Sequence, residues 1–209
     1  MDNHIGNVCK MTSESSILRI VEEDILRILG EANGKLSVDL IKSGIRVSNQ
    51  FISRAVKELE NESLIITRKN FILLTEKGRS KAGDIVKKHL ILEDYFKKTR
   101  GEREAHEMAH TLEHYVSKEV IGNIKKLSTL KRRGVPLTGI RLNEEGIITD
   151  LTFSDPGLFE RVVSLGIFPG ERIKVNNKIS ANIIVNTGNK KIALDGDIAK
   201  GIEVLKDER

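Results

Sequence analysis

The chain has 209 residues, of which 31% are charged and 39% hydrophobic, and its formal net charge is +5. This length allows two or three small domains with buried cores. No apolar run approaches the ~20 residues that a membrane-spanning helix needs, and the N-terminus lacks an apolar signal core. With a single cysteine, Cys9, the chain has no disulfide framework, so we expect a cytoplasmic protein with no membrane partner. The basic charge permits a nucleic-acid partner without requiring one.

The first eighty residues predict three helices followed by a hairpin. Apolar residues recur at helical spacing over 17–31, and a second short helix is expected over 36–43. Ser48 is a natural N-cap for a third helix, NQFISRAVKELENE. The runs LIITRKN and FILLTEKG predict a hairpin that turns at Lys69 and Asn70 and extends to Gly78. This is the order of a winged helix-turn-helix, in which the third helix enters the DNA major groove.

Basic and amide side chains gather at the start of the third helix and on the hairpin. Such side chains can reach base edges and phosphates. Glu58, Glu60 and Glu62 interrupt the basic residues, so a solvated surface is one alternative, and a protein-binding winged helix is another. These acids lie toward the end of the helix, where it would leave the groove. The residues that we expect to contact DNA are Ser48, Asn49, Gln50, Ser53, Arg54, Lys57, Arg68 and Lys69.

The stretch EREAHEMAHTLEHYVSKEV, residues 102–120, concentrates possible metal ligands. Its HEMAH segment matches the H-E-x-x-H pattern of helical zinc proteases, with Glu107 as the possible base. If the helix continued through residue 114, then His106, His110, Glu113 and His114 would share one face. These four residues would span about 12 Å of the helix, which is too far for one ion. The spacing therefore favours two neighbouring metal sites.

The preceding helix, predicted over 80–98, carries His89 and Glu93 four residues apart and so on one face. Four of the five histidines lie on these two helices. The alternative is a salt-bridged surface stripe without metal. Imidazole and carboxylate ligands without a thiol suit Fe²⁺, Mn²⁺, Co²⁺, Ni²⁺ or Zn²⁺ and do not choose among them.

The last third of the chain changes character. Ser117 and Glu119 predict the start of a helix through VIGNIKKLSTL, and KRRGVPLTGIRLNEEG reads as a linker. Short β-type runs follow, with turn residues between them, and predict a small barrel-like domain. These runs are GIITDLTFS, ERIKVNN, ANIIVNTG, KKIALDG and GIEVL.

From about Ile17 to Val204, the chain resembles the diphtheria toxin repressor and manganese-transport regulator family of metal-dependent transcriptional repressors. The resemblance rests on VSNQFISRAVKELENESLI, LTEKGRSKA, HLILEDYF and AHEMAHTLEHYVSKEV. The tail, RVVSLGIFPGERIKV through KKIALDGDIAKGIEVL, looks like the SH3-like domain shared with ferrous-iron-transport A-type proteins.

The resemblance implies an α+β multidomain fold with four parts after an N-terminal tail. The tail is 1–16, the winged helix-turn-helix is 17–80, the all-α dimerisation and metal-binding domain is 81–130, the linker is 131–145 and the small SH3-like β-barrel is 146–209. The implied function is repression by a homodimer that binds double-stranded DNA at a palindromic operator and controls metal-ion homeostasis genes. The implied protein is not an enzyme and has no small-molecule substrate.

The resemblance also implies two sets of metal ligands. The first site takes His89, Glu93 and His106, with Asp155 lent by the SH3-like domain. The second site takes Asp24, His110, Glu113 and His114.

Some positions depart from each branch of the family. The iron-responsive branch usually has methionine where Asp24 stands and cysteine where His110 stands. Arg27 falls where the manganese-responsive branch has a further ligating glutamate, and Leu158 falls at a second ligand position of the SH3-like domain. The His106 match and the third domain favour Fe²⁺, with Mn²⁺ as the alternative and Zn²⁺, Co²⁺ or Ni²⁺ as substitutes in vitro.

Two other functions make different predictions. A zinc hydrolase that uses HEMAH would lose its activity on replacement of Glu107. A metal-storing or protein-binding scaffold would bind metal without DNA affinity, and the basic hairpin argues against it.

Overall fold

The computed structural model describes residues 14–130 and 134–207, so most of the predicted N-terminal tail and residues 131–133 of the predicted linker lie outside the described residues. The chain divides into two compact units, Met1–Leu90 and Ile91–Arg209. Each unit has its own hydrophobic core. The boundary falls within a single continuous helix, α5 (Glu76–Phe96).

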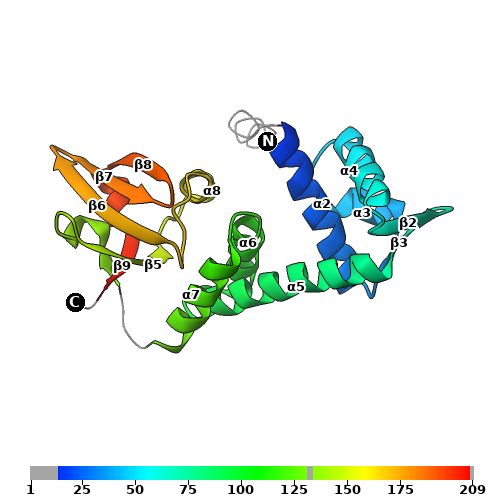
Figure 1. Cartoon of the computed structure of the whole chain (residues 1–209), viewed down its shortest axis with the longest axis horizontal. Coiled ribbons are helices and arrows are strands. Elements are labelled where there is room, and N and C mark those ends of the chain that lie inside the picture. The colour runs from blue at the N-terminus through cyan, green and yellow to red at the C-terminus, as the bar shows by residue number, and fades with distance from the viewer. Residues whose placement is uncertain (1–13, 131–133, 208–209) are drawn as a thin grey trace. The chain divides into compact units, whose positions relative to one another are not determined.

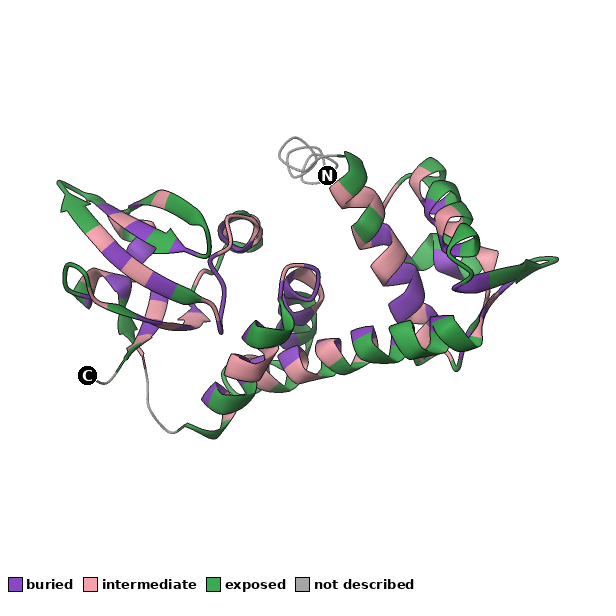
Figure 2. Ribbon diagram, in the orientation of Figure 1, coloured by how far each residue is buried: buried purple, intermediate pink, exposed green. Residues whose placement is uncertain are grey.

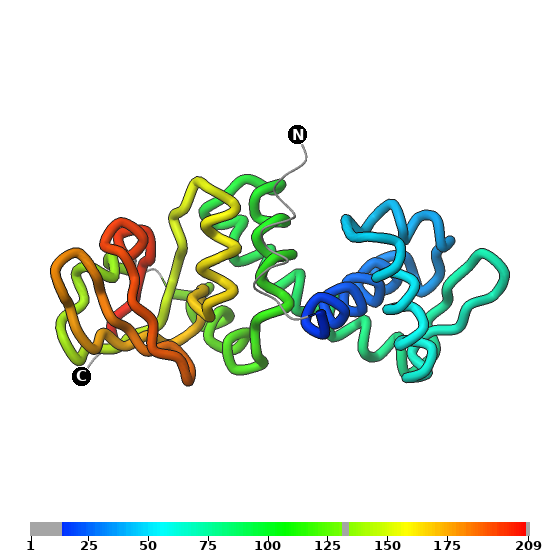
Figure 3. Tube along the Cα trace, turned by 90° about the horizontal axis from the view of Figure 1, so that it is seen from above, coloured from blue at the N-terminus to red at the C-terminus, as the bar shows by residue number. Residues whose placement is uncertain are grey.

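The first unit contains a three-stranded antiparallel sheet and the helices that cover it. Its sheet has the order β1-β3-β2. Figure 1 and Figure 3 both show the hairpin of β2 and β3 extending away from the helices of this unit. The elements before α5 are α2 (Glu14–Glu31), β1 (Lys35–Ser37), α3 (Val38–Gly44), α4 (Asn49–Asn61), β2 (Ile65–Arg68) and β3 (Phe71–Leu74).

Helical periodicity on α2 and α4 builds this core. Ile25 and Leu29 of α2 are buried together with Ile52 and Leu59 of α4. In Figure 2, α2 carries buried residues, whereas the hairpin is mostly exposed. The predicted order of three helices and a hairpin is confirmed.

Two details of this unit differ from the sequence prediction. Residues Lys35–Ser37 form a strand rather than the start of a helix, because Leu36 pairs with Ile72 of β3. Helix α5 begins at Glu76, so the hairpin ends before Gly78; the Thr75 side chain accepts a hydrogen bond from the Gly78 amide there.

The second unit joins helices to a six-stranded antiparallel sheet of order β4-β9-β5-β6-β7-β8. The predicted β-type runs all form strands. After the end of α5 come α6 (Glu102–Leu112), α7 (Lys118–Thr129), β4 (Val135–Pro136), η1 (Leu137–Gly139), β5 (Glu145–Leu151), α8 (Pro156–Ser164), β6 (Arg172–Ile179), β7 (Asn182–Thr187), β8 (Lys190–Asp195), α9 (Gly196–Lys200) and β9 (Ile202–Lys206).

One hydrophobic core continues from the helices of this unit into its sheet. Leu92, Leu112 and Ile124 of the helices belong to the same buried cluster as Ile148 and Val204 of the sheet. The predicted helix start at Ser117 is confirmed, since its side chain accepts a hydrogen bond from the Val120 amide.

Polar contacts add to this packing. Tyr95 donates a hydrogen bond to the Thr149 carbonyl at 2.5 Å, and Asn123 donates one to the Gly170 carbonyl at 2.9 Å.

Part of the predicted linker also belongs to the core, because Leu137 and Ile140 are fully buried. Among the described helices, none is long and apolar enough to cross a bilayer.

Candidate metal centre

Helix α6 presents most of the candidate ligands and is shorter than the sequence predicted. It begins after Gly101 and ends at Leu112. Glu102 and Glu104 lie in its first turn, where the helix dipole interacts favourably with negative charge. Glu113 keeps a helical conformation as the C-cap, and His114 lies in the turn that follows. The assumption of a single helix through residue 114 was therefore wrong, because the chain turns there toward the Ser117 cap of α7.

The end of α6 nevertheless brings three candidate ligands together. Glu113 Oε1 lies 3.3 Å from His110 Nδ1 and 3.6 Å from His114 Nε2. The Glu113 side chain is fully buried and that of His114 is 4% exposed, whereas that of His110 is 40% exposed. Each of the three offers a ligand atom within 4.8 Å of the others. A buried carboxylate beside two imidazoles is a suitable donor set for a divalent transition-metal ion.

The second group of ligands is centred on Glu93. His106 Nδ1 lies 3.2 Å from Glu93 Oε2, and Lys97 Nζ lies 2.6 Å from Glu93 Oε1. The hydrogen bond from Lys97, assisted by His106, lowers the pKa of Glu93 to about 2. His89 is buried one turn earlier on α5, with a ligand atom within 4.8 Å of the Glu93 carboxylate. Lys97 was missed in the sequence, although its i,i+4 spacing from Glu93 could have indicated it.

Asp24 and Asp155 have different surroundings. Asp24 is buried on α2, and Arg27 Nη2 lies 4.0 Å from its carboxylate. Asp155 caps α8 by accepting a hydrogen bond from the Gly157 amide at 2.9 Å. In the described part of the chain, Asp155 belongs to neither group of converging ligand atoms.

The residues predicted to contact DNA all lie on the surface of the first unit. Those of α4 and its N-cap are exposed, as are Arg68 and Lys69 on the hairpin. Ser48 occupies the N-cap position as predicted, but its side chain makes no capping hydrogen bond. Arg54 forms an ion pair with Glu14 in the first turn of α2.

The HEMAH residues do not converge as a protease site requires. His106 lies beside Glu93, and His110 lies beside Glu113. Glu107, the possible base, is exposed and pairs with Arg103 at 3.4 Å.

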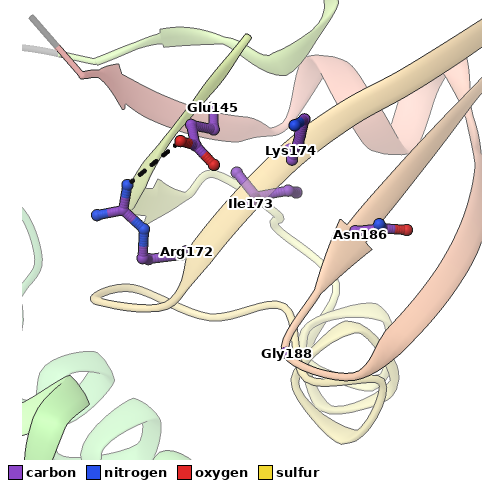
Figure 4. Close-up of a pocket in the computed structure, with 6 residues that line it drawn as sticks. All are labelled: Glu145, Arg172, Ile173, Lys174, Asn186 and Gly188. Atoms are coloured by element: carbon purple, nitrogen blue, oxygen red, sulfur yellow. Dashed lines mark ion pairs between the residues drawn. The ribbon is translucent and has the colours of Figure 1, made fainter. Parts of the chain in front are cut away.

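A hollow on the sheet offers no alternative site. Glu145, Arg172, Ile173, Lys174, Asn186 and Gly188 line it (Figure 4). One of its two cations, Arg172, pairs with Asp207 and lies 4.0 Å from Glu145. None of its residues belongs to the two groups of candidate ligands.

Two family models match the chain. Residues 75–129 match the iron dependent repressor, metal binding and dimerisation domain, and residues 135–206 match the FeoA domain. The first match contains both groups of candidate ligands, which lie on α5, on α6 and in the turn that follows α6. The chain therefore combines the metal-binding and dimerisation domain of iron-dependent repressors with a C-terminal FeoA domain. The predicted recognition and fold class are thus confirmed.

Solved structures of three other proteins are similar to this chain over most of its length. A manganese-dependent transcriptional repressor in complex with manganese is 22% identical, with 88% of this chain and 99% of that chain covered and a TM-score of 0.45. IdeR of T. acidophilum is 19% identical, with 94% of this chain and 99% of that chain covered and a TM-score of 0.42. The manganese regulator SloR is 19% identical, with 90% and 98% covered and a TM-score of 0.44. No curated protein matches the chain.

The two matched domains decide between the functional alternatives. Members of the repressor family are transcriptional regulators and not enzymes, so the interpretation of HEMAH as a hydrolase motif is set aside. A metal-responsive repressor is the function that the family supports, and metal binding belongs to the matched domain.

Proposed function

We propose that this repressor responds to Fe²⁺ and binds, as a homodimer, a pseudo-palindromic operator that controls genes of metal-ion homeostasis. The observation that carries the proposal is the group of His110, Glu113 and His114, because it places a buried carboxylate between two imidazoles inside the matched metal-binding domain. Mn²⁺ is the alternative, since these ligands suit either ion. The preference for Fe²⁺ rests on the resemblance at His106 and on the presence of the FeoA domain.

The proposed second site consists of Asp24, His110, Glu113 and His114, and the first of His89, Glu93 and His106, with Asp155 as an added ligand. A bound divalent ion would supply positive charge to carboxylates that are costly to bury unpaired. Neutral imidazoles would donate their ring nitrogens. Because Asp24 belongs to the DNA-binding unit and the other second-site ligands to the metal-binding domain, ligation would favour one mutual orientation of the two. An ion that prefers the DNA-competent arrangement shifts the population toward it.

The surface residues of α4 and the hairpin would contact DNA in this proposal. Asn49, Gln50 and Ser53 can reach base edges, and Arg54, Lys57, Arg68 and Lys69 can neutralise phosphates. Two such units in a homodimer would read half-sites separated by about one helical turn or a multiple of it. The proposed division into domains at residues 17–80, 81–130 and 146–209 assigns these contacts to the first domain.

The test is anaerobic selection of bound fragments from a random DNA pool in Fe²⁺, Mn²⁺, Zn²⁺ or chelator. We expect one metal to enrich an inverted repeat that chelator does not. Glu113→Gln should abolish the metal-stimulated enrichment, because the buried ligand loses its charge. Glu107→Gln should leave it unchanged, since Glu107 is an exposed carboxylate of the same helix. Equal enrichment with Glu113→Gln, or metal binding without any enriched sequence, would contradict the proposal.

A further inference from the structure

Helix α2 carries a buried arginine beside the proposed ligand Asp24. The Arg27 side chain is 7% exposed, whereas that of Arg19, two turns earlier, is 52% exposed. Arg27 Nη1 donates a hydrogen bond to Glu31 Oε1 at 2.9 Å, and its Nη2 lies 4.0 Å from Asp24 Oδ1. The i+3 and i+4 spacings place all three side chains on one face of α2, so the helix itself fixes this group.

This arrangement keeps a permanent positive charge next to the Asp24 carboxylate. An arginine guanidinium carries a permanent positive charge in proteins. Because Arg27 is buried, water and salt screen its charge less than they screen an exposed arginine. A divalent cation at Asp24 would meet this like charge at short range, and Glu31 would offset only part of the repulsion.

We propose that Arg27 weakens the affinity of the Asp24-containing site for divalent cations and so raises the metal concentration at which the repressor responds. The proposal rests on the proposed role of Asp24 as a ligand. Arg27 is itself no ligand, since a guanidinium has no lone pair to donate. Its charge makes it a residue that sets the affinity of the site.

The experiment isolates the proposed second site and changes the charge beside it. All variants carry His106→Ala, which removes an exposed ligand of the other group. Mn²⁺ is titrated into the full chain and free Mn²⁺ is measured by its electron paramagnetic resonance signal. Arg27→Met removes the charge and keeps an unbranched stem, and we expect Mn²⁺ to bind about tenfold more tightly, equivalent to about 1.4 kcal/mol. Arg27→Lys retains the charge and should bind within about twofold of the parent.

Two controls identify the cause of the change. Arg19→Met removes the other arginine of α2, which pairs with Glu23 at the same i,i+4 spacing, and should leave the Mn²⁺ affinity unchanged. The gain in Mn²⁺ affinity from Arg27→Met should disappear in a chain that also carries Asp24→Asn, because Arg27 is proposed to act on the ion that Asp24 binds. Thermal unfolding of each variant checks that the first unit remains folded.

The outcomes separate this inference from the proposed function. If the parent binds Mn²⁺ and Arg27→Met does not bind it more tightly, the role of Arg27 is overturned while the site stands. If Arg27→Met raises the Mn²⁺ affinity equally with and without Asp24→Asn, the role of Arg27 is also overturned, since its effect would not depend on Asp24. If the parent binds no Mn²⁺ at the second site, the proposed ligand set fails and the inference fails with it.

Discussion

At the scale of single residues, Glu93 shows how strongly neighbouring groups control a candidate ligand. Lys97 at 2.6 Å and His106 at 3.2 Å together hold the pKa of its carboxyl near 2 instead of 4.5. A carboxyl whose pKa is depressed in the folded state stabilises that state at pH values above its unfolded pKa. The contribution of Glu93 is therefore present above pH 4.5 and is lost as the pH falls toward 2.

Replacing Lys97 tests this coupling. We expect Lys97→Met to raise the pKa of Glu93 toward 4.5, because the largest contribution to its depression is the hydrogen bond from Lys97. The measurement is a carboxyl-carbon NMR titration of the metal-free chain. Lys98→Met is the matched control, since Lys98 donates instead to the Ser128 carbonyl. A Glu93 pKa that stays near 2 in Lys97→Met would show that Lys97 does not hold the carboxylate.

At the scale of elements, the start of α2 meets the proposed recognition helix. Arg54 of α4 pairs with Glu14 in the first turn of α2, and both side chains are more than half exposed. An exposed ion pair contributes ~0–1 kcal/mol, so DNA phosphates can compete for Arg54. Glu14 therefore lowers the positive charge that α4 offers to DNA.

Removing this acid should strengthen DNA binding. We expect Glu14→Gln to tighten the complex with any duplex by roughly two- to fivefold, and to steepen the slope of log affinity against log salt by at most ~0.9, the effect of one added phosphate contact. Fluorescence anisotropy over a series of salt concentrations measures both. Glu23→Gln, on the same helix, breaks a pair with Arg19 that does not involve α4 and serves as control. Equal gains from both substitutions would indicate only a change in net charge.

The same scale shows what the sequence could predict. Apolar periodicity and turn residues were sufficient for α2, α4, the hairpin and the strands of the sheet, because these signals are local. The strand Lys35–Ser37 was missed because it exists only through pairing with β3, more than thirty residues later. Likewise, the sequence identified His110, Glu113 and His114 as candidate ligands but placed His114 on the helix. The predicted cap at Ser117 marks where α7 begins and not where α6 ends.

At the scale of the whole chain, hydrogen bonds and an ion pair join the helices of the second unit to its sheet. Arg100, after the end of α5, donates hydrogen bonds from Nη2 to both carboxylate oxygens of Asp150 at 3.1 and 3.2 Å and to the Leu151 carbonyl at 3.1 Å. Burial raises the pKa of the neighbouring Tyr95 phenol, and the negative charge of Asp150 adds to this, so the phenol stays protonated and donates to Thr149. No spacing rule could have paired positions fifty residues apart, whereas the structure places them across one buried junction.

Replacing Arg100 should destabilise the junction between α5 and β5. Arg100→Met removes the guanidinium that pairs with the mostly buried Asp150 carboxylate. Breaking such a pair costs about 3 kcal/mol. We expect faster amide hydrogen exchange in β5 and in the last turn of α5, because both ends of the junction open more often. Arg103→Met is the control, since Arg103 is almost fully exposed and pairs with Glu107 of the same helix. If exchange in β5 stays at its wild-type rate in Arg100→Met, the shared apolar core alone holds the FeoA sheet on the helices.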